Sequence, residues 1–155
     1  MTPGINVVKK NKIIHKVHEY AHDSSHESYG LEAANKMGVP AARVFKTLVV
    51  SLDNKELAVG VIPVSSMLSM KLIAKAAGAK KAVMAAQSDV ERSTGYVLGG
   101  VSPLGQKKRL KTIIDSSAKN HSTVYVSAGR RGLEIELSPS DLEKLVNGVL
   151  AEICQ

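Results

Sequence analysis

The sequence predicts an α+β fold, in which a curved, barrel-like mixed β-sheet is flanked by short helices, in a single domain over residues 1–155. Strand-like segments follow one another in hairpins rather than alternating strictly with helices, which favours a mixed or largely antiparallel sheet. Short amphipathic segments with capping residues lie between these strands. A length of 155 residues with 44% hydrophobic and 23% charged residues suits one globular domain that buries its core without disulfide bonds.

Helix signals occur at five places along the chain. Thr2, Ser69 and Ser138 are typical N-cap residues, and proline follows the first and last of them at the first helical position. Ser88 and Glu91 have the spacing of a capping box, which predicts that a helix begins after Ser88. A glycine ends a further short helix predicted over residues 31–37. The last helix is expected to carry four apolar residues on one face: Leu142, Leu145, Val146 and Val149.

Strand signals are strongest in the middle of the chain. Two β-branched and apolar runs, residues 45–52 and 56–64, are separated by Asp53-Asn54-Lys55 and predict a hairpin. Weaker strand signals lie at residues 13–20, 112–114, 123–127 and 133–137. A polar turn is expected over residues 22–28.

Two apparent motifs fail on inspection. His18-Glu19-Tyr20-Ala21-His22 matches the zinc-protease pattern, but that chemistry needs both histidines on one helix face. The residues before it favour a strand, and Asp23 and two serines follow it, so we expect a solvated loop and no metal, although His26 lies nearby. Gly100 and Gly105 have P-loop spacing without the Lys-Ser/Thr pair that such a loop needs.

Cys154 is the one cysteine, and we expect it in a frayed tail with little reactivity.

Charge and aromatic content narrow the choice of partner. The chain has 21 Lys and Arg against 14 Asp and Glu, so its net charge of +7 favours a polyanionic or phosphorylated partner, unless the surface is simply basic. With four Tyr, one Phe and no Trp, it cannot supply an aromatic platform for stacking RNA bases. Nucleic acid would therefore be contacted through phosphates and a terminal nucleotide. The longest uncharged run, residues 57–70, is too short for a membrane span, which takes about 18 residues or more.

Three features are candidates for function. Lys46 is flanked by apolar residues at a strand entrance, so it is either a partly buried functional ammonium or an outward-facing lysine. The glycine-rich run at residues 92–105 predicts a loop that exposes backbone amides to a bound group, or else a structural turn. Four cations in the five positions 107–111 suit either a phosphate track or a solvated strand face.

Four segments of the chain are specific enough to indicate a family: FKTLVV at 45–50, GAKKAVMA at 78–85, RSTGYVLGGVSPLGQKKRLKTIID at 92–115 and YVSAGRRGLEIEL at 125–137. In these segments the chain resembles the YbaK-type proteins, which are freestanding relatives of the editing domain inserted in bacterial prolyl-tRNA synthetases. The resemblance extends over nearly the whole chain. Tyr29 and Glu134 stand where relatives often have Phe and Asp, and Leu31 stands where an acidic residue is common.

The resemblance implies which residues form the site. Lys46 and Gly99 take the catalytic positions. The substrate-binding positions fall on Tyr20, Tyr29, Thr47, Gly100, Ser102, Pro103, Ser127 and Glu134. Contacts with tRNA phosphates fall on Lys107, Lys108, Arg109 and Lys111. The family needs no metal or cofactor.

The resemblance also implies a cytoplasmic, trans-acting enzyme that deacylates Cys-tRNA(Pro), and by extension Cys-tRNA(Cys). Prolyl-tRNA synthetase is the expected partner in a transient ternary complex, with no role for DNA or a membrane. In the family's mechanism the thiol of the substrate attacks its own carbonyl and a cyclic thiolactone leaves. Two alternatives are a water-mediated hydrolase of Ala- or Ser-charged tRNA and a non-catalytic module that binds tRNA or a synthetase.

Overall fold

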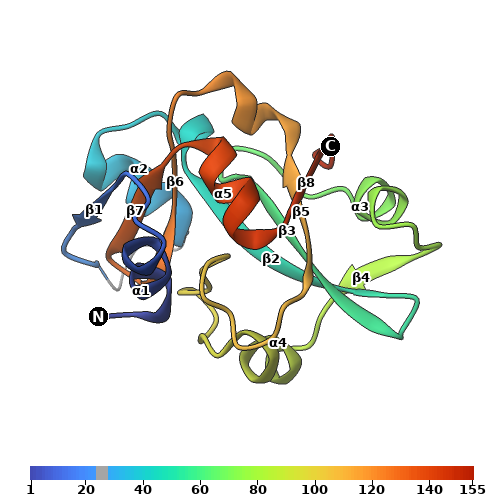
Figure 1. The fold of residues 1–155 in the computed structure, drawn as a ribbon. Coiled ribbons are helices and arrows are strands. Elements are labelled where there is room, and N and C mark those ends of the chain that lie inside the picture. The colour runs from blue at the N-terminus through green and yellow to red at the C-terminus, as the bar shows by residue number, and fades with distance from the viewer. Residues whose placement is uncertain (24–27) are drawn as a thin grey trace.

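The computed structural model describes residues 1–23 and 28–155, and its strands form two sheets (Figure 1). One has three strands in the order β1-β7-β6, and the other has five in the order β4-β2-β3-β5-β8. The strands are β1 (His15–Glu19), β2 (Phe45–Leu52), β3 (Glu56–Pro63), β4 (Ala82–Met84), β5 (Lys111–Asp115), β6 (Val124–Arg130), β7 (Leu133–Leu137) and β8 (Val149–Ala151). The predicted α+β class with a mixed sheet is confirmed, but these strands do not close into a barrel.

The five-stranded sheet is built around the β2–β3 hairpin. Phe45 pairs with Pro63 and Leu52 with Glu56, so the two strands run antiparallel over their full length. β3 and β5 run parallel, as do β5 and β8, which makes the sheet mixed. The three-residue strands β4 and β8 were not predicted, because each is defined by its pairing with a longer strand rather than by its own sequence.

Three of the predicted helix starts are confirmed. Thr2, Ser69 and Ser138 each accept a hydrogen bond from a backbone N–H three residues later, and so cap α1 (Pro3–Lys10), α3 (Met70–Ala76) and α5 (Pro139–Val146). The capping box at Ser88 is wrong: α4 (Gln87–Thr94) begins before Ser88, and its N-cap Ala86 has no side-chain bond. α2 (Tyr29–Met37) begins two residues earlier than predicted, with Ser28 as its cap.

The C-terminal segment also differs from the prediction. Asn147 has a left-handed backbone that ends α5, so Val149 lies in strand β8 rather than on a helix face. The chain end is not frayed. Ile153 is fully buried, and Leu68 and Cys154 form an antiparallel bridge. Burial raises the pKa of the Cys154 thiol to about 11, so its low reactivity has a different cause from the one expected.

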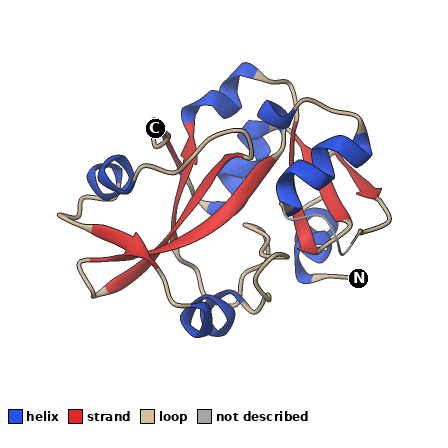
Figure 2. Ribbon diagram, turned by 180° about the vertical axis from the view of Figure 1, so that it is seen from behind, coloured by secondary structure: helices blue, strands red, loops and turns tan. Residues whose placement is uncertain are grey.

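The two sheets meet along a seam between β2 and β6. An isolated parallel bridge joins Val44 to Tyr125, and helix α2 packs its buried alanines Ala33 and Ala34 into the same cluster. The segment between α4 and β5, residues 95–110, crosses this region as an irregular loop (Figure 2). The seam and the loop together position the site described below.

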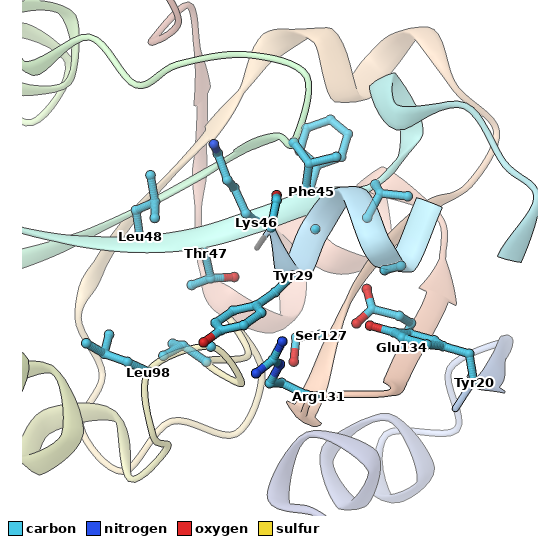
Figure 3. Close-up of a pocket in the computed structure, with 17 residues that line it drawn as sticks. Tyr20, Tyr29, Phe45, Lys46, Thr47, Leu48, Leu98, Ser127, Arg131 and Glu134 are labelled. Carbon is cyan, nitrogen blue, oxygen red and sulfur yellow. The ribbon is translucent and has the colours of Figure 1, made fainter. Parts of the chain in front are cut away.

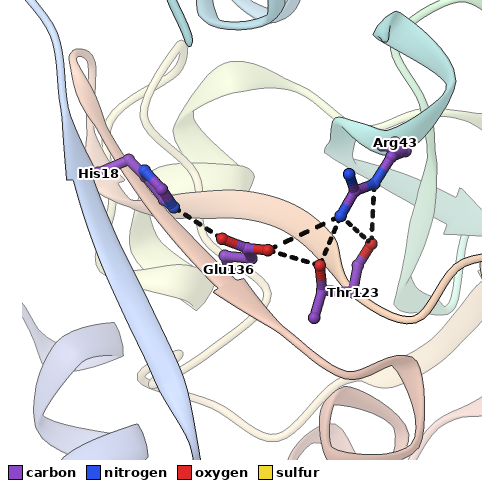
Figure 4. A network of polar contacts seen from close by, with 4 residues as sticks. All are labelled: His18, Arg43, Thr123 and Glu136. Atoms are coloured by element: carbon purple, nitrogen blue, oxygen red, sulfur yellow. Dashed lines mark hydrogen bonds and ion pairs between the residues drawn. The ribbon is translucent and has the colours of Figure 1, made fainter. Parts of the chain in front are cut away.

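A polar network links β1 and β7 to segments at the seam (Figure 4). Glu136 on β7 accepts hydrogen bonds from His18 at 2.8 Å and from the Thr123 hydroxyl at 2.6 Å, while Arg43 donates to the Thr123 carbonyl. His22 instead lies 2.8 Å from Glu32. The HEYAH segment is thus a strand through Glu19, and the expected exposed loop is found only after it, at Ala21 and His22. Its two imidazoles contact different glutamates. Residues 24–27 of the expected polar turn, His26 among them, lie outside the described residues.

Among residues 1–23 and 28–155, no helix has both the length and the apolar character needed to cross a membrane.

Candidate active site

A pocket of about 230 Å³ lies at the seam between the two sheets (Figure 3). The five-stranded sheet contributes the start of β2, and the three-stranded sheet contributes Ser127 and Glu134. The first turn of α2 and the loop residues Leu98, Gly99 and Val101 complete the wall. The pocket is therefore assembled from segments far apart in the sequence.

Most of the predicted site residues meet in this pocket. Seven line it: Tyr20, Tyr29, Lys46, Thr47, Gly99, Ser127 and Glu134. Gly100, Ser102 and Pro103 do not: Gly100 packs against the backbone of Arg130, and Pro103 borders a separate groove. Ser102 is fully buried, and its hydroxyl accepts from the Leu104 N–H. These three residues shape the loop rather than the pocket wall.

Tyr29 is held between two neighbours. The guanidinium carbon of Arg131 lies 3.4 Å from the centroid of its ring. On the loop side, a Cβ added at Gly99 would lie 2.3 Å from Tyr29 Cε2, so only glycine permits this approach. The aromatic ring is therefore a fixed part of the pocket wall.

Three buried polar atoms in this pocket have no hydrogen-bond partner within the protein. They are the Thr47 hydroxyl oxygen and two nitrogens of Arg131, Nε and one terminal NH2. No other buried side-chain nitrogen or oxygen among the described residues is left in this state. A buried polar group without a hydrogen-bond partner destabilises a fold by about 1–3 kcal/mol, so such groups are rare unless they have a function. Three in one pocket indicate a surface built to meet a polar ligand.

Two buried carboxyl groups, those of Glu134 and Glu32, lie beside this pocket. Glu134 lines it, and burial raises the pKa of its carboxyl to about 8, so the group is mostly protonated at neutral pH. Glu32 is also fully buried, but it accepts from the Asp23 N–H at 2.6 Å and lies 4.0 Å from Arg131. Burial, followed by the nearby Glu134, also raises the pKa of Tyr20. Glu134 and Tyr20 thus add little negative charge to the pocket floor at neutral pH.

Lys46 borders the pocket on the opposite side of β2 from Thr47. Figure 3 shows Thr47 pointing toward Tyr29 while the Lys46 ammonium points away from it, as the alternation of a strand requires. Lys46 lies on the same face of β2 as Leu48, and its positive charge acts to lower the pKa of the Cys154 thiol, against the larger effect of burial. It is half-buried, and lies at the rim rather than on the floor.

The basic cluster at residues 107–111 is divided by the fold. Lys111 lies 3.6 Å from Glu56 and donates to the Ala77 carbonyl, so its charge is already partnered. Lys108 and Arg109 line a separate groove, and Lys107 is exposed beside α4. The four predicted phosphate contacts therefore do not share one surface, and their binding of tRNA stays a prediction.

Arg131 is a charged pocket residue that the sequence did not identify. It follows β6 in a two-residue turn, where an arginine next to another arginine and a glycine looks like an ordinary solvated hairpin. Nothing in the local pattern predicts that its guanidinium folds back over Tyr29, about a hundred residues earlier in the chain. The β6–β7 hairpin carries Arg131, and the packing of α2 at the seam places Tyr29 against it.

The fold and pocket define a small α+β protein with a ligand site at the seam of two sheets. The model of the aminoacyl-tRNA editing domain matches residues 27–145. A curated relative from Enterococcus faecalis, EbsC, named as a candidate Cys-tRNA(Pro)/Cys-tRNA(Cys) deacylase, is 40% identical over 152 residues, covering 98% of this chain and 92% of that protein. The chain belongs to the aminoacyl-tRNA editing domain family.

Solved structures agree on the fold. A crystal structure titled as a candidate trans-editing enzyme for prolyl-tRNA synthetase matches with a TM-score of 0.80 at 21% identity, covering 91% of this chain and 87% of that one. A crystal structure of a hypothetical protein matches with a TM-score of 0.87 at 24% identity, covering 99% of each chain.

Proposed function

We propose that this protein is a trans-acting aminoacyl-tRNA deacylase that removes cysteine from mischarged tRNA(Pro). The observation that carries the proposal is the convergence of three buried polar atoms without a hydrogen-bond partner, on Thr47 and Arg131, in one pocket at the seam. Family membership supplies the substrate class, and the name of the Enterococcus relative supports cysteine as the amino acid removed. Prolyl-tRNA synthetase in a transient complex, and action in the cytoplasm, belong to the same proposal.

The pocket suits a reaction that needs orientation more than a protein nucleophile. An aminoacyl ester already has a good leaving group, and holding two groups of one molecule in attack geometry can equal an effective concentration of about 10⁵ M or more. In the proposed step the cysteinyl thiolate attacks its own carbonyl carbon, the bond to the ribose oxygen breaks, and that oxygen takes a proton. The products are a cyclic thiolactone and free tRNA.

The pocket residues have separate roles in this step. The Thr47 hydroxyl and the Arg131 nitrogens hydrogen-bond the polar atoms of the aminoacyl ester. Gly99 brings a backbone amide near the carbonyl oxygen, where negative charge develops. Glu134, mostly protonated because its pKa is about 8, adds no charge that would oppose the thiolate. Lys46 at the rim anchors the phosphate or ribose of the terminal adenosine.

A water-mediated hydrolase of Ala- or Ser-charged tRNA is the competing function, because the same pocket could orient a water molecule. The decisive experiment compares Cys-, Ser- and S-methyl-Cys-charged tRNA(Pro) in single-turnover deacylation. A thiol with a pKa near ~8.5 is a few per cent thiolate at neutral pH, whereas an alcohol supplies almost none. We expect fast loss of Cys and slow loss of the other two.

The other outcomes separate the alternatives. Equal rates for free and S-methylated cysteine would exclude thiol attack and assign the reaction to water. Binding of tRNA without any shortening of ester lifetime would leave a non-catalytic module.

A further inference from the structure

A second hollow, of about 440 Å³, lies between the C-terminal turns of α1 and α5 and the loop that leads into β5. Figure 1 shows where α1, α5 and β5 lie in the fold. We call it the basic groove, because its lining includes four cations: Lys10, Lys108, Arg109 and Lys144. All four are exposed, and no carboxylate is part of the lining. They come from three segments that are distant in the sequence.

The charges of the basic groove are not neutralised within the protein. None of its four cations forms an ion pair with any described residue, in contrast to Lys111 with Glu56, Arg130 with Glu19 and Arg92 with Asp89. Like charges gathered around one hollow repel one another, and a bound anion relieves that repulsion. Lysines in the last turns of α1 and α5 also suit the helix dipoles, but Lys108 and Arg109 are on no helix.

The lining also indicates what kind of anion fits. No Tyr, Phe or Trp faces the groove, so it offers no surface on which a base could stack. Its apolar members, such as Val7 and Leu145, are aliphatic. The groove is thus equipped to contact a sugar–phosphate backbone without reading its sequence.

The same loop lines both the pocket and the groove. Gly99 borders the pocket and Pro103 borders the groove. Four residues of chain span at most about 14 Å. A stacked strand advances about 3.4 Å per nucleotide, so this distance corresponds to about four nucleotides. A nucleotide whose ester lies in the pocket therefore has the backbone of its nearest neighbours within reach of the groove.

We propose that the basic groove binds the phosphate backbone of the tRNA acceptor end, within a few nucleotides of the aminoacylated terminus. This rests on the proposed function, since it takes the pocket as the site of the aminoacyl ester. It assigns Lys10 and Lys144, on the two helices, to the same contact as Lys108 and Arg109. It leaves Lys111 outside that contact.

The test uses the double variant Lys10→Gln/Lys144→Gln, which we call the groove variant. The control is Lys71→Gln/Lys75→Gln on α3. Each double variant removes two exposed positive charges from helices, so the two proteins have the same net charge. The affinity for uncharged tRNA(Pro) is measured against KCl concentration. Each lost phosphate contact lowers the slope of log affinity against log salt by about 0.7–0.9, so we expect a loss of ~1.5 in the slope for the groove variant. The control should keep the wild-type slope.

A second measurement separates the groove from the pocket. The ratio of kcat/KM for Cys-tRNA(Pro) to kcat/KM for a cysteinyl-adenosine ester should fall about tenfold in the groove variant, because the small ester has no backbone to bind. If the groove and control variants bind tRNA alike, the groove proposal is overturned while the deacylase proposal stands. If wild-type protein cleaves neither substrate but still binds tRNA through the groove, the deacylase proposal fails and the groove remains.

Discussion

The guanidinium of Arg131 stacks 3.4 Å from the centroid of the Tyr29 ring, and two of its nitrogens stay buried without a hydrogen-bond partner. The stack fixes the direction of the fork, because the planar group must lie flat on the ring. Glu32 at 4.0 Å supplies an opposite charge, but at that distance it does not form a hydrogen bond. The free donors are thus held in place before any ligand arrives.

Arg131→Lys should lower single-turnover deacylation by about ten- to a hundredfold while the protein stays folded. Lysine keeps the charge but loses the planar stack and the fork of donors, and a hydrogen bond to a charged group contributes about 1.5–3 kcal/mol. The control is Arg130→Lys at the neighbouring exposed residue, whose partner is the exposed Glu19. Equal rates for the two variants would show that Arg131 only supports the turn.

Gly99→Ala should abolish most activity because the added Cβ would lie 2.3 Å from the Tyr29 ring and displace it. The control is Gly38→Ala, which also has a positive φ but nothing within 4 Å of the new Cβ. Both variants should lose about 1–2 kcal/mol in the free energy of unfolding from the left-handed backbone. Chemical denaturation checks the shared loss, and deacylation should separate the two. A fully active Gly99→Ala variant would contradict a fixed Tyr29.

Thr47→Val should raise the free energy of unfolding and lower activity together. The Thr47 hydroxyl is buried without a partner, and replacing it with a methyl group removes a polar group that costs about 1–3 kcal/mol to bury. Thr94→Val is the control, because the buried Thr94 hydroxyl donates to Val90 and accepts from Tyr96. That variant should lose stability. A destabilised Thr47→Val variant would mean that the hydroxyl is already satisfied.

Lys46→Ala should largely abolish deacylation and leave the fold intact, because a half-buried lysine at the entrance of β2 contributes little to the core. Lys55→Ala in the β2–β3 turn removes the same charge from an exposed position and serves as the control. Unfolding by denaturant and single-turnover kinetics are measured on both. Undiminished turnover in the Lys46 variant would remove its role.

Local signals predicted much of the fold, and they failed where pairing decides the structure. Thr2, Ser69 and Ser138 cap helices because a hydroxyl reaches an unbonded N–H within three residues, which is a local event. The helix start predicted from the capping box at Ser88 was wrong, because α4 already begins at Gln87. β4 and β8 exist only because β2 and β5 offer them an edge, and no pattern within three residues can encode that.

The candidate site divides in the same way. Tyr29, Thr47 and Glu134 were found through the resemblance, and the structure brings them into one pocket. Arg131 was not predicted, because its place in the pocket depends on a contact with Tyr29, which is distant in the sequence. The basic run at 107–111 looks uniform in sequence, yet strand pairing sends Lys111 to Glu56 and leaves its neighbours in the groove or in solvent. The charge of a side chain in the sequence does not indicate which surface or partner that side chain faces in the fold.

Glu134 should make the protein less stable as the pH rises from about 4.5 toward 8. Burial raises the pKa of its carboxyl to about 8 in the folded state, above the ordinary value of 4.5 that the unfolded chain restores. Between these values the folded state holds a proton that the unfolded state has released. The free energy of unfolding then falls with increasing pH, by at most ~1.4 kcal/mol per unit, and levels off above the folded pKa.

Glu134→Gln keeps the shape of the neutral acid without its titration, so it should flatten the pH dependence of unfolding by denaturant between pH 5 and 8. Glu136→Gln is the matched control on the same strand. Burial opposes the charge of Glu136, but hydrogen bonds from Thr123 and His18 outweigh it and lower the pKa, so its contribution disappears only as the pH falls below the ordinary range. The control should therefore keep the wild-type slope between pH 5 and 8. If Glu134→Gln also keeps that slope, Glu134 is charged in the folded protein, and the low-charge pocket floor that the thiolate step requires is wrong.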